Sequence, residues 1–380
     1  FLIYIIKYIY IYILMKTNLS LGFIGGGANS TIGKMHYLAS KLDDRWKLVS
    51  GFFSRNKKIN SKSGSNYNID KSRVYSSLEN FIKHEGKKLN AIVLLTPTPT
   101  HSKVLQKLKK INIPIISEKP LINSADQMKK INNLFTKKNL IRVTYNYTGY
   151  PILRELKEMI KKKKIGEIKQ FFFYMPQNAF VSNTSKKIKP KTWRLSDMEY
   201  PNILGDLGSH LINMCDFLFE KTPNKVFAKF FNHSKYKIID NVYFMTEINK
   251  NIFGQFIISK TNPGISNGLE LKIVGTAKTV VWKQDDPEKL LLFNMDGTKT
   301  IFDRSSAIYE ANKDRYNRYK PGHPSGFLEA FANIYHDIAN EIISKKKSNY
   351  TFDLKSSQKI SNFFEASIKS DKSGKWIKVN

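Results

Sequence analysis

Between Leu19 and about Tyr147, short apolar runs alternate with amphipathic stretches. The apolar runs have the length and composition of strands buried on both faces: LGFIG (21–25), WKLVSGFF (46–53), AIVLLT (91–96), IPIIS (113–117) and LIRVTYN (140–146). Segments with helical periodicity lie between them, including 101–110 and 124–138. This alternation predicts a doubly wound, parallel sheet.

After about residue 150, longer strands follow one another without helices between them. We expect strands at 167–175, 224–231, 241–248, 253–259, 269–275 and 279–283, after a helix at 151–164 and before an amphipathic helix at 326–343. Polar loops are expected at 182–192 and 303–324. The pattern predicts a second α/β domain with a large, mostly antiparallel sheet that is open on one face. The domains are expected at 15–147 and 148–380.

The first 14 residues, FLIYIIKYIYIYIL, are apolar but shorter than the roughly 20 residues that span a bilayer. They lack the basic region and small-residue cleavage site of a signal peptide. Met15 is followed by KTNLSLGFIGGG, a typical start for a cytoplasmic α/β protein. We therefore expect residues 1–14 to be upstream sequence rather than native protein. A short membrane-associating anchor is the alternative.

Composition narrows the class of protein further. A length of 380 residues fits two domains, and 41% hydrophobic residues can form packed cores. The single cysteine, Cys215, excludes an internal disulfide. No Cys/His cluster has metal-ligand spacing, so no metal site is expected. These features favour a reducing, cytoplasmic setting.

The net charge of +32 raises the question of nucleic-acid or membrane binding. Lys and Arg are spread along the whole chain, with only short runs such as 161–164 and 345–347. The aromatic residues lie in strand-like apolar runs rather than between the basic residues. A solvated basic surface is therefore the simpler interpretation, and neither nucleic acid nor membrane is expected as a partner.

A glycine-rich turn, GGGANSTIG (25–33), follows the first expected strand. Gly25 permits a tight turn, Gly27 lets a pyrophosphate approach the backbone, and Gly33 permits close helix–strand packing. The following helix would direct N–H groups and its positive dipole end at the phosphates. The spacing has three more residues before the last glycine than G-x-G-x-x-G. The position between strand and helix still favours a dinucleotide-binding Rossmann domain.

The end of the second strand bears on the choice of cofactor. An NAD-specific site usually has an acidic residue there for the ribose 2′-hydroxyl. This chain instead has Ser54 and Arg55, which could bind a 2′-phosphate. A solvent-facing turn is the alternative interpretation of Arg55. The cofactor is expected to be NAD or NADP, with the residues favouring NADP or dual use.

The ends of two later strands carry candidate site residues. In an open α/β sheet, the carboxyl ends of the strands face the ligand, so Lys119 of SEKP (117–120) would point at nicotinamide and substrate. A partly desolvated lysine can bind a substrate oxygen and share in its proton transfer. Thr96 and Pro97 of TPTPTH would line the cofactor cleft, whereas His101 fits equally well as a helix-start residue.

The segment GDLGSH (205–210) places Asp206 and His210 four residues apart. If the segment is helical, both side chains lie on one face, one turn apart. A carboxylate can then orient an imidazole that accepts and returns a proton near neutral pH. The alternative, non-catalytic interpretation of the same spacing is a solvated helix face or a helix cap.

The glycine-rich turn, Glu118-Lys119-Pro120 and the Asp206/His210 segment together resemble the Gfo/Idh/MocA oxidoreductases, the family of glucose–fructose oxidoreductase and inositol dehydrogenase. The resemblance runs from about Leu19 to the C-terminus and includes the strand-rich second half and SGKWIKV (373–379). GGGANSTIG, NYTGYP (146–151) and PGHPSGFLEAFANIY (321–335) look like a sub-branch of sugar or inositol-type dehydrogenases.

The resemblance implies a catalytic set of Lys119, Asp206 and His210. His210 would be the acid/base, Asp206 would orient it, and Lys119 would bind the reacting hydroxyl while hydride passes to or from nicotinamide. Glu118 joins the expected cofactor-binding residues. The open sheet would form the interface of a homodimer or homotetramer.

Further polar residues are candidates for binding a sugar or cyclic polyol. They follow strands or the basic loop, and ordinary core or loop roles are the alternative for each: Tyr147, Gln177, Asn178, Trp193 and Arg194. His323, between Gly322 and Pro324, is a residue whose position the sequence does not define. The expected function is an NAD(P)-dependent dehydrogenase acting on a sugar or polyol hydroxyl. A non-catalytic NAD(P)-binding sensor of the same fold is the alternative.

Overall fold

The computed structural model describes residues 18–136, 139–181 and 195–380, so residues 1–17 lie outside the description. The chain divides into two compact units. Unit 1 comprises Phe1–Ile122, Gln127–Gly149 and Phe327–Lys355, and unit 2 comprises Asn123–Asp126, Tyr150–Gly326 and Ser356–Asn380. The return of Phe327–Lys355 to unit 1 is a feature that the sequence analysis did not anticipate.

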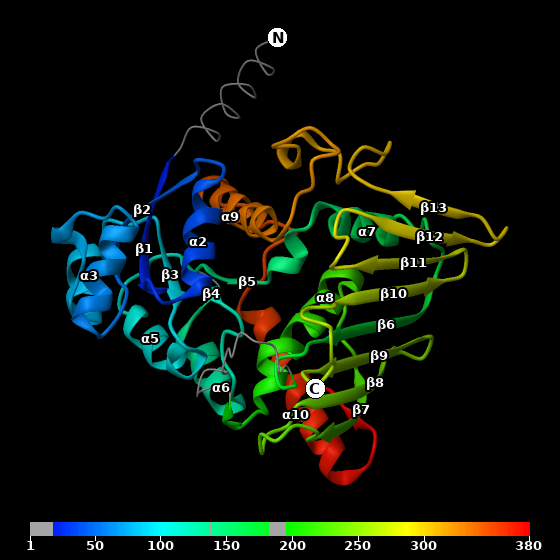
Figure 1. Cartoon of the computed structure of the whole chain (residues 1–380). Coiled ribbons are helices and arrows are strands. Elements are labelled where there is room, and N and C mark those ends of the chain that lie inside the picture. Colours follow the sequence, from blue (N-terminus) through cyan, green and yellow to red (C-terminus); the bar gives the residue numbers. More distant parts are fainter. Residues whose placement is uncertain (1–17, 137–138, 182–194) are drawn as a thin grey trace. The chain divides into compact units, whose positions relative to one another are not determined.

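Unit 1 has a five-stranded parallel sheet in the order β2-β1-β3-β4-β5, which confirms the predicted doubly wound sheet (Figure 1). The strands are β1 (Leu19–Gly25), β2 (Trp46–Phe52), β3 (Ala91–Leu95), β4 (Ile115–Glu118) and β5 (Ile141–Thr144). The helices are α2 (Thr31–Lys41), α3 (Lys57–Asn66), α4 (Leu78–Glu85), α5 (His101–Leu108), α6 (Ala125–Leu134, which starts in unit 2) and α9 (Phe327–Ser344). Short helical turns are η1 (Lys71–Arg73), η2 (Thr98–Thr100) and η3 (Asn146–Gly149).

Alternate residues of β1 explain why this sheet needs helices on both faces. Leu21 and Phe23 pack into one core cluster with Tyr335 of α9. Gly22 points to the opposite face, where a Cβ would lie 2.7 Å from the Phe81 ring of α4. Both faces of the sheet are therefore buried against helices, as expected for strands that are apolar along their whole length. The winding reverses at β1, between β2 and β3, and the carboxyl ends of strands at such a switch point bind ligands in open α/β sheets.

Unit 2 contains a nine-stranded sheet in the order β13-β12-β11-β10-β6-β9-β8-β7-β14 (Figure 1). The strands are β6 (Ile168–Pro176), β7 (Lys225–Phe231), β8 (Asn241–Asn249), β9 (Ile252–Ser259), β10 (Glu270–Gly275), β11 (Lys278–Lys283), β12 (Leu290–Asn294), β13 (Lys299–Phe302) and β14 (Ile377–Lys378). The helical elements are α7 (Pro151–Lys161), a π-helical turn η5 (Leu204–Gly208), α8 (Ser209–Phe219), η6 (Asp314–Tyr316) and α10 (Leu354–Ser373). Among the described strands of this sheet, only β6 and β9 pair in parallel, so the predicted mostly antiparallel sheet is confirmed.

One face of the large sheet packs against helices through aromatic side chains. Phe171 of β6 contacts Phe219 of α8, and Phe256 of β9 contacts Phe363 of α10. The alternate positions on the strands point the other way, and large apolar side chains among them are 40–50% exposed: Phe231, Tyr243, Met245 and Phe253. The sheet is therefore open on one face, as predicted.

Candidate active site

The glycine-rich turn connects β1 to α2 in unit 1. Gly25 and Gly26 have φ values of 84° and 68°, in the region that favours glycine. A Cβ on Gly33 would lie 2.2 Å from the carbonyl oxygen of Gly26, so the first turn of α2 touches the turn backbone. Ser30 caps α2 by accepting a hydrogen bond from the Gly33 N–H at 3.1 Å. The turn thus presents a helix N-terminus beside bare backbone, which suits a pyrophosphate.

Side chains from α3 and from the segment just after it support the turn. Ser63 Oγ accepts a 2.7 Å hydrogen bond from the Ala28 N–H, and the Tyr67 hydroxyl donates to the Gly26 carbonyl at 2.7 Å. Burial and the neighbouring Tyr37 raise the pKa of Tyr67 to about 12, so its hydroxyl stays a donor. The sequence analysis missed Ser63 and Tyr67.

Ser54 and Arg55 follow β2 at the edge of a cavity of about 260 Å³, which Ile69 and Val74 also line. The Ser54 backbone N–H donates to Asn60 Oδ1 at 3.2 Å, and Ser54 Oγ accepts from the Asn56 N–H at 3.1 Å. Arg55 is exposed. Basic and hydroxyl side chains share the cavity lining: Ser54, Arg55, Lys57, Ser61, Ser65, Lys71 and Ser76.

Thr96, Pro97 and His101 follow β3. Thr96 Oγ1 accepts a 2.8 Å hydrogen bond from the Thr100 hydroxyl, and Pro97 precedes the turn η2. His101 is the first residue of α5 and is fully buried. Its ring nitrogens lie 2.8 Å from the Thr96 carbonyl and 3.0 Å from the Leu121 carbonyl. His101 therefore ties the end of β3 to the segment that follows Lys119, and burial lowers its pKa.

The end of β4 carries Glu118 and the half-buried Lys119, whose peptide bond to Pro120 is cis. Glu118 Oε1 lies 3.0 Å from His36 Nε2 and accepts a 2.8 Å hydrogen bond from the Thr144 hydroxyl. The Tyr335 hydroxyl lies 2.7 Å from His36 Nδ1. This side chain of the E-K-P motif thus joins β4 to α2, β5 and α9.

One arrangement of protons that satisfies each contact has a neutral His36. Burial holds the pKa of Tyr335 well above its ordinary value, so its hydroxyl donates to His36 Nδ1. His36 Nε2 then carries the proton that is donated to Glu118. Burial alone would raise the pKa of Glu118, but the His36 hydrogen bond, with Lys119 and Thr144, outweighs burial and lowers it. Glu118 is ionised near neutral pH.

In unit 2, Asp206 lies on the π-helical turn that leads directly into α8, and His210 is the second residue of α8. The predicted helical segment is thus present, with its first turn widened. Such turns inside helices are frequent at functional sites. His210 is 7% exposed. Asp206 Oδ2 accepts a 2.8 Å hydrogen bond from Lys260 Nζ, a partner that the sequence analysis missed.

The structure places the remaining substrate candidates as follows. Tyr147 is buried in η3. Gln177 and Asn178 follow β6 and are half-buried, and Gln177 Nε2 donates to Asn267 Oδ1 at 2.7 Å. Trp193 and Arg194 lie outside the described residues, as does the whole of the expected loop at 182–192.

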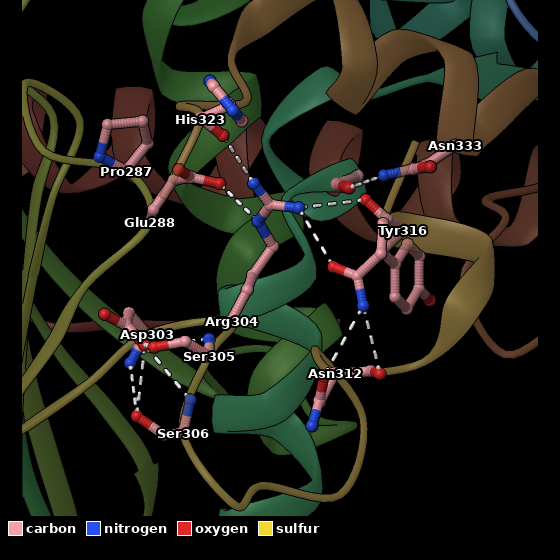
Figure 2. Close-up of polar contacts among 12 residues, drawn as sticks. Pro287, Glu288, Asp303, Arg304, Ser305, Ser306, Asn312, Tyr316, His323 and Asn333 are labelled. Atoms are coloured by element: carbon pink, nitrogen blue, oxygen red, sulfur yellow. Dashed lines mark hydrogen bonds and ion pairs between the residues drawn. The ribbon is translucent and has the colours of Figure 1, made fainter. Parts of the chain in front are cut away.

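The polar loop at 303–324, in unit 2, is anchored by Arg304, which is 3% exposed (Figure 2). Arg304 forms an ion pair with Glu288 through Nε. Its Nη1 donates to the Tyr316 carbonyl at 3.2 Å, and its Nη2 donates to the His323 carbonyl at 2.9 Å. The His323 side chain is exposed. His323 therefore contributes a backbone contact to the anchoring of this loop.

The described part of the chain contains no group of three or more His, Cys, Asp or Glu side chains that could hold a metal ion. No helix within it is both long and apolar enough to cross a membrane.

Comparisons with known proteins agree with this architecture. Residues 19–147 match the oxidoreductase family with an NAD-binding Rossmann fold, and residues 153–281 match the GFO/IDH/MocA C-terminal domain. The oxidoreductase YfiI of Bacillus subtilis is 24% identical over 86% of this chain and 86% of that protein.

Solved structures give the same result. An oxidoreductase from Sinorhizobium meliloti is 28% identical with a TM-score of 0.83, covering 96% of this chain and 100% of that one. An inositol dehydrogenase homolog from Azotobacter vinelandii, complexed with NAD⁺, shares the fold with a TM-score of 0.88 at 20% identity, covering 96% and 98%. Because the two matched regions together span most of the chain, the protein belongs to the Gfo/Idh/MocA oxidoreductase family and has an NAD-binding Rossmann fold.

Proposed function

We propose that the protein is an NAD(P)-dependent dehydrogenase that acts on a hydroxyl-bearing carbon of a sugar or cyclic polyol. The observation that carries the proposal is the carboxylate of Asp206, 11% exposed, one helical turn before the buried His210, in a member of an NAD-binding oxidoreductase family. Support for the substrate class comes from the inositol dehydrogenase homolog with the same fold.

Each proposed residue has one task. His210 takes the hydroxyl proton when the alcohol is oxidised and returns it when the ketone is reduced. Asp206 orients the imidazole and stabilises its protonated form. Lys119 donates a hydrogen bond to the reacting oxygen. Its half-buried position at the carboxyl end of β4 supports that role.

The residues of the β1–α2 turn fit the cofactor. The space above Gly27 is narrow, because a Cβ there would lie 3.0 Å from Ser63 Oγ and 3.1 Å from the Phe53 carbonyl oxygen. The positive φ of Gly25 and the capped N-terminus of α2 complete a cradle for a pyrophosphate. Bound NAD(P) would accept or supply the hydride at its nicotinamide ring. Thr96, Pro97 and Glu118 belong to the ends of the neighbouring strands in the same proposal.

Loss of His210 tests the proton-transfer role. Turnover of a panel of cyclic polyols and sugars, beginning with myo-inositol, is followed by the absorbance of the reduced cofactor with NAD and with NADP. His210→Ala should reduce kcat by about 10²–10⁴-fold while leaving NADH binding unchanged. The exposed His323→Ala is the matched control and should retain full activity. NADH binding by a wild-type protein that turns over no substrate would favour the sensor alternative.

We propose that Ser54 and Arg55 allow the protein to use NADP. The basic, hydroxyl-lined cavity beside them supports a 2′-phosphate site. Arg55→Ala should weaken NADPH binding by about tenfold or more, since a charge-assisted hydrogen bond contributes about 1.5–3 kcal/mol, and should change NADH binding little. Lys58→Ala, an exposed neighbour outside the cavity lining, is the control. Equal weakening of both cofactors in Arg55→Ala would contradict the proposal.

We also propose that the open face of the nine-stranded sheet mediates self-association into a homodimer or homotetramer. Exposed Tyr243, Met245 and Phe253 support this, because apolar residues gathered on one face are typical of protein interfaces. Met245→Glu combined with Phe253→Lys should lower the molar mass measured by light scattering. An unchanged mass would place any association elsewhere.

A further inference from the structure

Lys260 is a buried lysine at the end of β9, in unit 2. Its main chain is held on both sides: the Lys260 N–H donates to the Asp240 carbonyl at 2.9 Å, and its carbonyl accepts from the Phe180 N–H at 3.0 Å. Lys260 therefore extends the backbone hydrogen bonding of β9 by one residue beyond the end of the strand. These two hydrogen bonds fix the main chain of Lys260 and therefore the direction in which its side chain leaves the backbone.

The ammonium group of Lys260 lies beside a carboxylate and an aromatic ring. It donates to Asp206 Oδ2 at 2.8 Å and lies 5.1 Å from the centre of the Phe180 ring. Lys260 is 2% exposed, and lysine is rarely buried without a charged partner. Asp206 therefore compensates the charge of Lys260, and Lys260 compensates that of Asp206.

This pairing bears on the proton chemistry because His210 follows Asp206 by one turn. A carboxylate with no other partner would stabilise the imidazolium ion and hold a proton on His210. A cation 2.8 Å from the same carboxylate offsets part of that attraction. Low solvent access makes the effect larger than at the surface, since water does not screen the charges.

We infer that Lys260 is a positioning residue for the reaction: by pairing with Asp206, it fixes that carboxylate and weakens the hold of Asp206 on the His210 proton. The inference rests on the proposed roles of Asp206 and His210. With Lys260 in place, neutral His210, which is the form that accepts a proton from the alcohol, is populated at lower pH.

Other charged groups of unit 2 lie on the elements that pack around η5, α8 and the end of β9. Most of their carboxylates and ammonium groups have partners of their own. Asp240 accepts from the His233 and Ser234 N–H groups and from Asn241, Asp197 accepts from the Asn202 and Ile239 N–H groups, Glu199 binds Ser124, and Asp216 pairs with Lys359. Glu365 of α10 is a further carboxylate on these elements. Lys260, by contrast, donates to Asp206 itself.

The test is the titration of His210 in the full-length protein, observed by NMR of histidine labelled at Cε1 and assigned by loss of its signal in His210→Gln. Lys260→Gln should move the His210 titration to higher pH by about one unit. Lys260→Arg, which keeps the charge, should restore the wild-type titration. An unchanged titration in Lys260→Gln would overturn the inference.

Unit 2 offers a control in Lys157 of α7, a second buried lysine whose partner Glu220 is exposed. Lys157 is 5% exposed, donates to Glu220 at 2.9 Å and lies 5.2 Å from the Phe217 ring centre, at the far end of α8. Lys157→Gln should lower thermal stability without moving the His210 titration. A shift of equal size in both variants would show a general loss of structure and would overturn the inference.

A second comparison applies if Lys260→Gln does not fold. Asp206→Asn and the doubly neutral Asp206→Asn/Lys260→Met remove the carboxylate charge first and then the ammonium charge. The His210 titration should rise from the single to the double variant, and no rise would again overturn the inference. Turnover of the polyol panel then separates the two proposals. A titration shift without any turnover would support Lys260 while rejecting the proposed function. For an active protein, the acidic limb of the kcat/KM profile should move with the titration.

Discussion

Glu118 in unit 1 and Asp206 in unit 2 are both largely buried carboxylates beside proposed catalytic residues, but their partners differ in kind. Glu118 is held by the His36 ring and the Thr144 hydroxyl, with Tyr335 behind His36. Asp206 is held by the ammonium group of Lys260. A chain of hydrogen bonds from three elements fixes geometry. A single ion pair also determines how much charge the site carries.

The largest effect is expected where the ion pair is broken. Asp206→Ala leaves the Lys260 ammonium buried without its partner, which should lower the free energy of unfolding of unit 2 by about 3–5 kcal/mol. Asp216→Ala on α8 is the control, because its partner Lys359 is about one third exposed, and it should lose less than about 1 kcal/mol. Urea unfolding followed by tryptophan fluorescence measures both, since Trp282 is buried in unit 2 and Trp46 in unit 1. An equal loss of unfolding free energy in the two variants would show that the Asp206–Lys260 pair stabilises unit 2 no more than a partly exposed pair does.

A smaller effect is expected when Glu118 is neutralised. Glu118→Gln keeps an acceptor for Thr144 but weakens the contact with His36, and should lower the free energy of unfolding of unit 1 by about 2 kcal/mol. Glu79→Gln, at an exposed pair with Lys107, should have almost no effect. The Trp46 signal reports this transition. A loss as large as that of Asp206→Ala would mean that Glu118 is also held mainly by charge.

The pH dependence of Glu118 sharpens the same contrast. The pKa of Glu118 is lowered in the folded protein from its ordinary 4.5. The unfolded chain therefore binds this proton more tightly, and the stabilisation by Glu118 is complete above pH 4.5 and lost as pH falls through the folded-state value. The stability difference between wild type and Glu118→Gln should accordingly shrink below pH 4.5 in urea titrations at several pH values. A difference that grows on acidification would contradict the lowered pKa.

The fold was predictable from the sequence where the buried residues of an element are apolar. The five strands of unit 1 are continuous apolar runs because both faces of the sheet are covered, and the sequence analysis identified all of them. Helix α3 was not identified, because its inward face is polar and small: Asn60, Ser63 and Gly64 are its buried residues. Strands β12 and β13 were missed too, although Asp296-Gly297 between them is a typical hairpin turn, with φ 83° at the glycine.

The candidate site was predictable to the extent that its residues lie in short motifs. Glu118-Lys119-Pro120 and Asp206/His210 are each local in sequence. His36 and Lys260 are brought to these motifs only by tertiary packing, and Lys260 is one of 63 lysines and arginines. It directly follows the predicted strand at 253–259, but its partner Asp206 is 54 residues away along the chain.

The smallest expected effect lies at the far end of the Glu118 network. Tyr335→Phe removes the hydroxyl that donates to His36 Nδ1 while leaving the 3.0 Å hydrogen bond from Trp46 Nε1 to the Tyr335 carbonyl intact. One neutral hydrogen bond contributes about 1 kcal/mol, so the Trp46 unfolding transition should shift by that amount. Tyr309→Phe, an exposed tyrosine, is the control. If Glu118 depends on His36 rather than on Tyr335 directly, the variant should leave the pH dependence assigned to Glu118 in place. Loss of this pH dependence in Tyr335→Phe would show that Glu118, His36 and Tyr335 titrate as one unit. The Glu118 network and the Asp206–Lys260 pair would then differ only in how many groups share the charge.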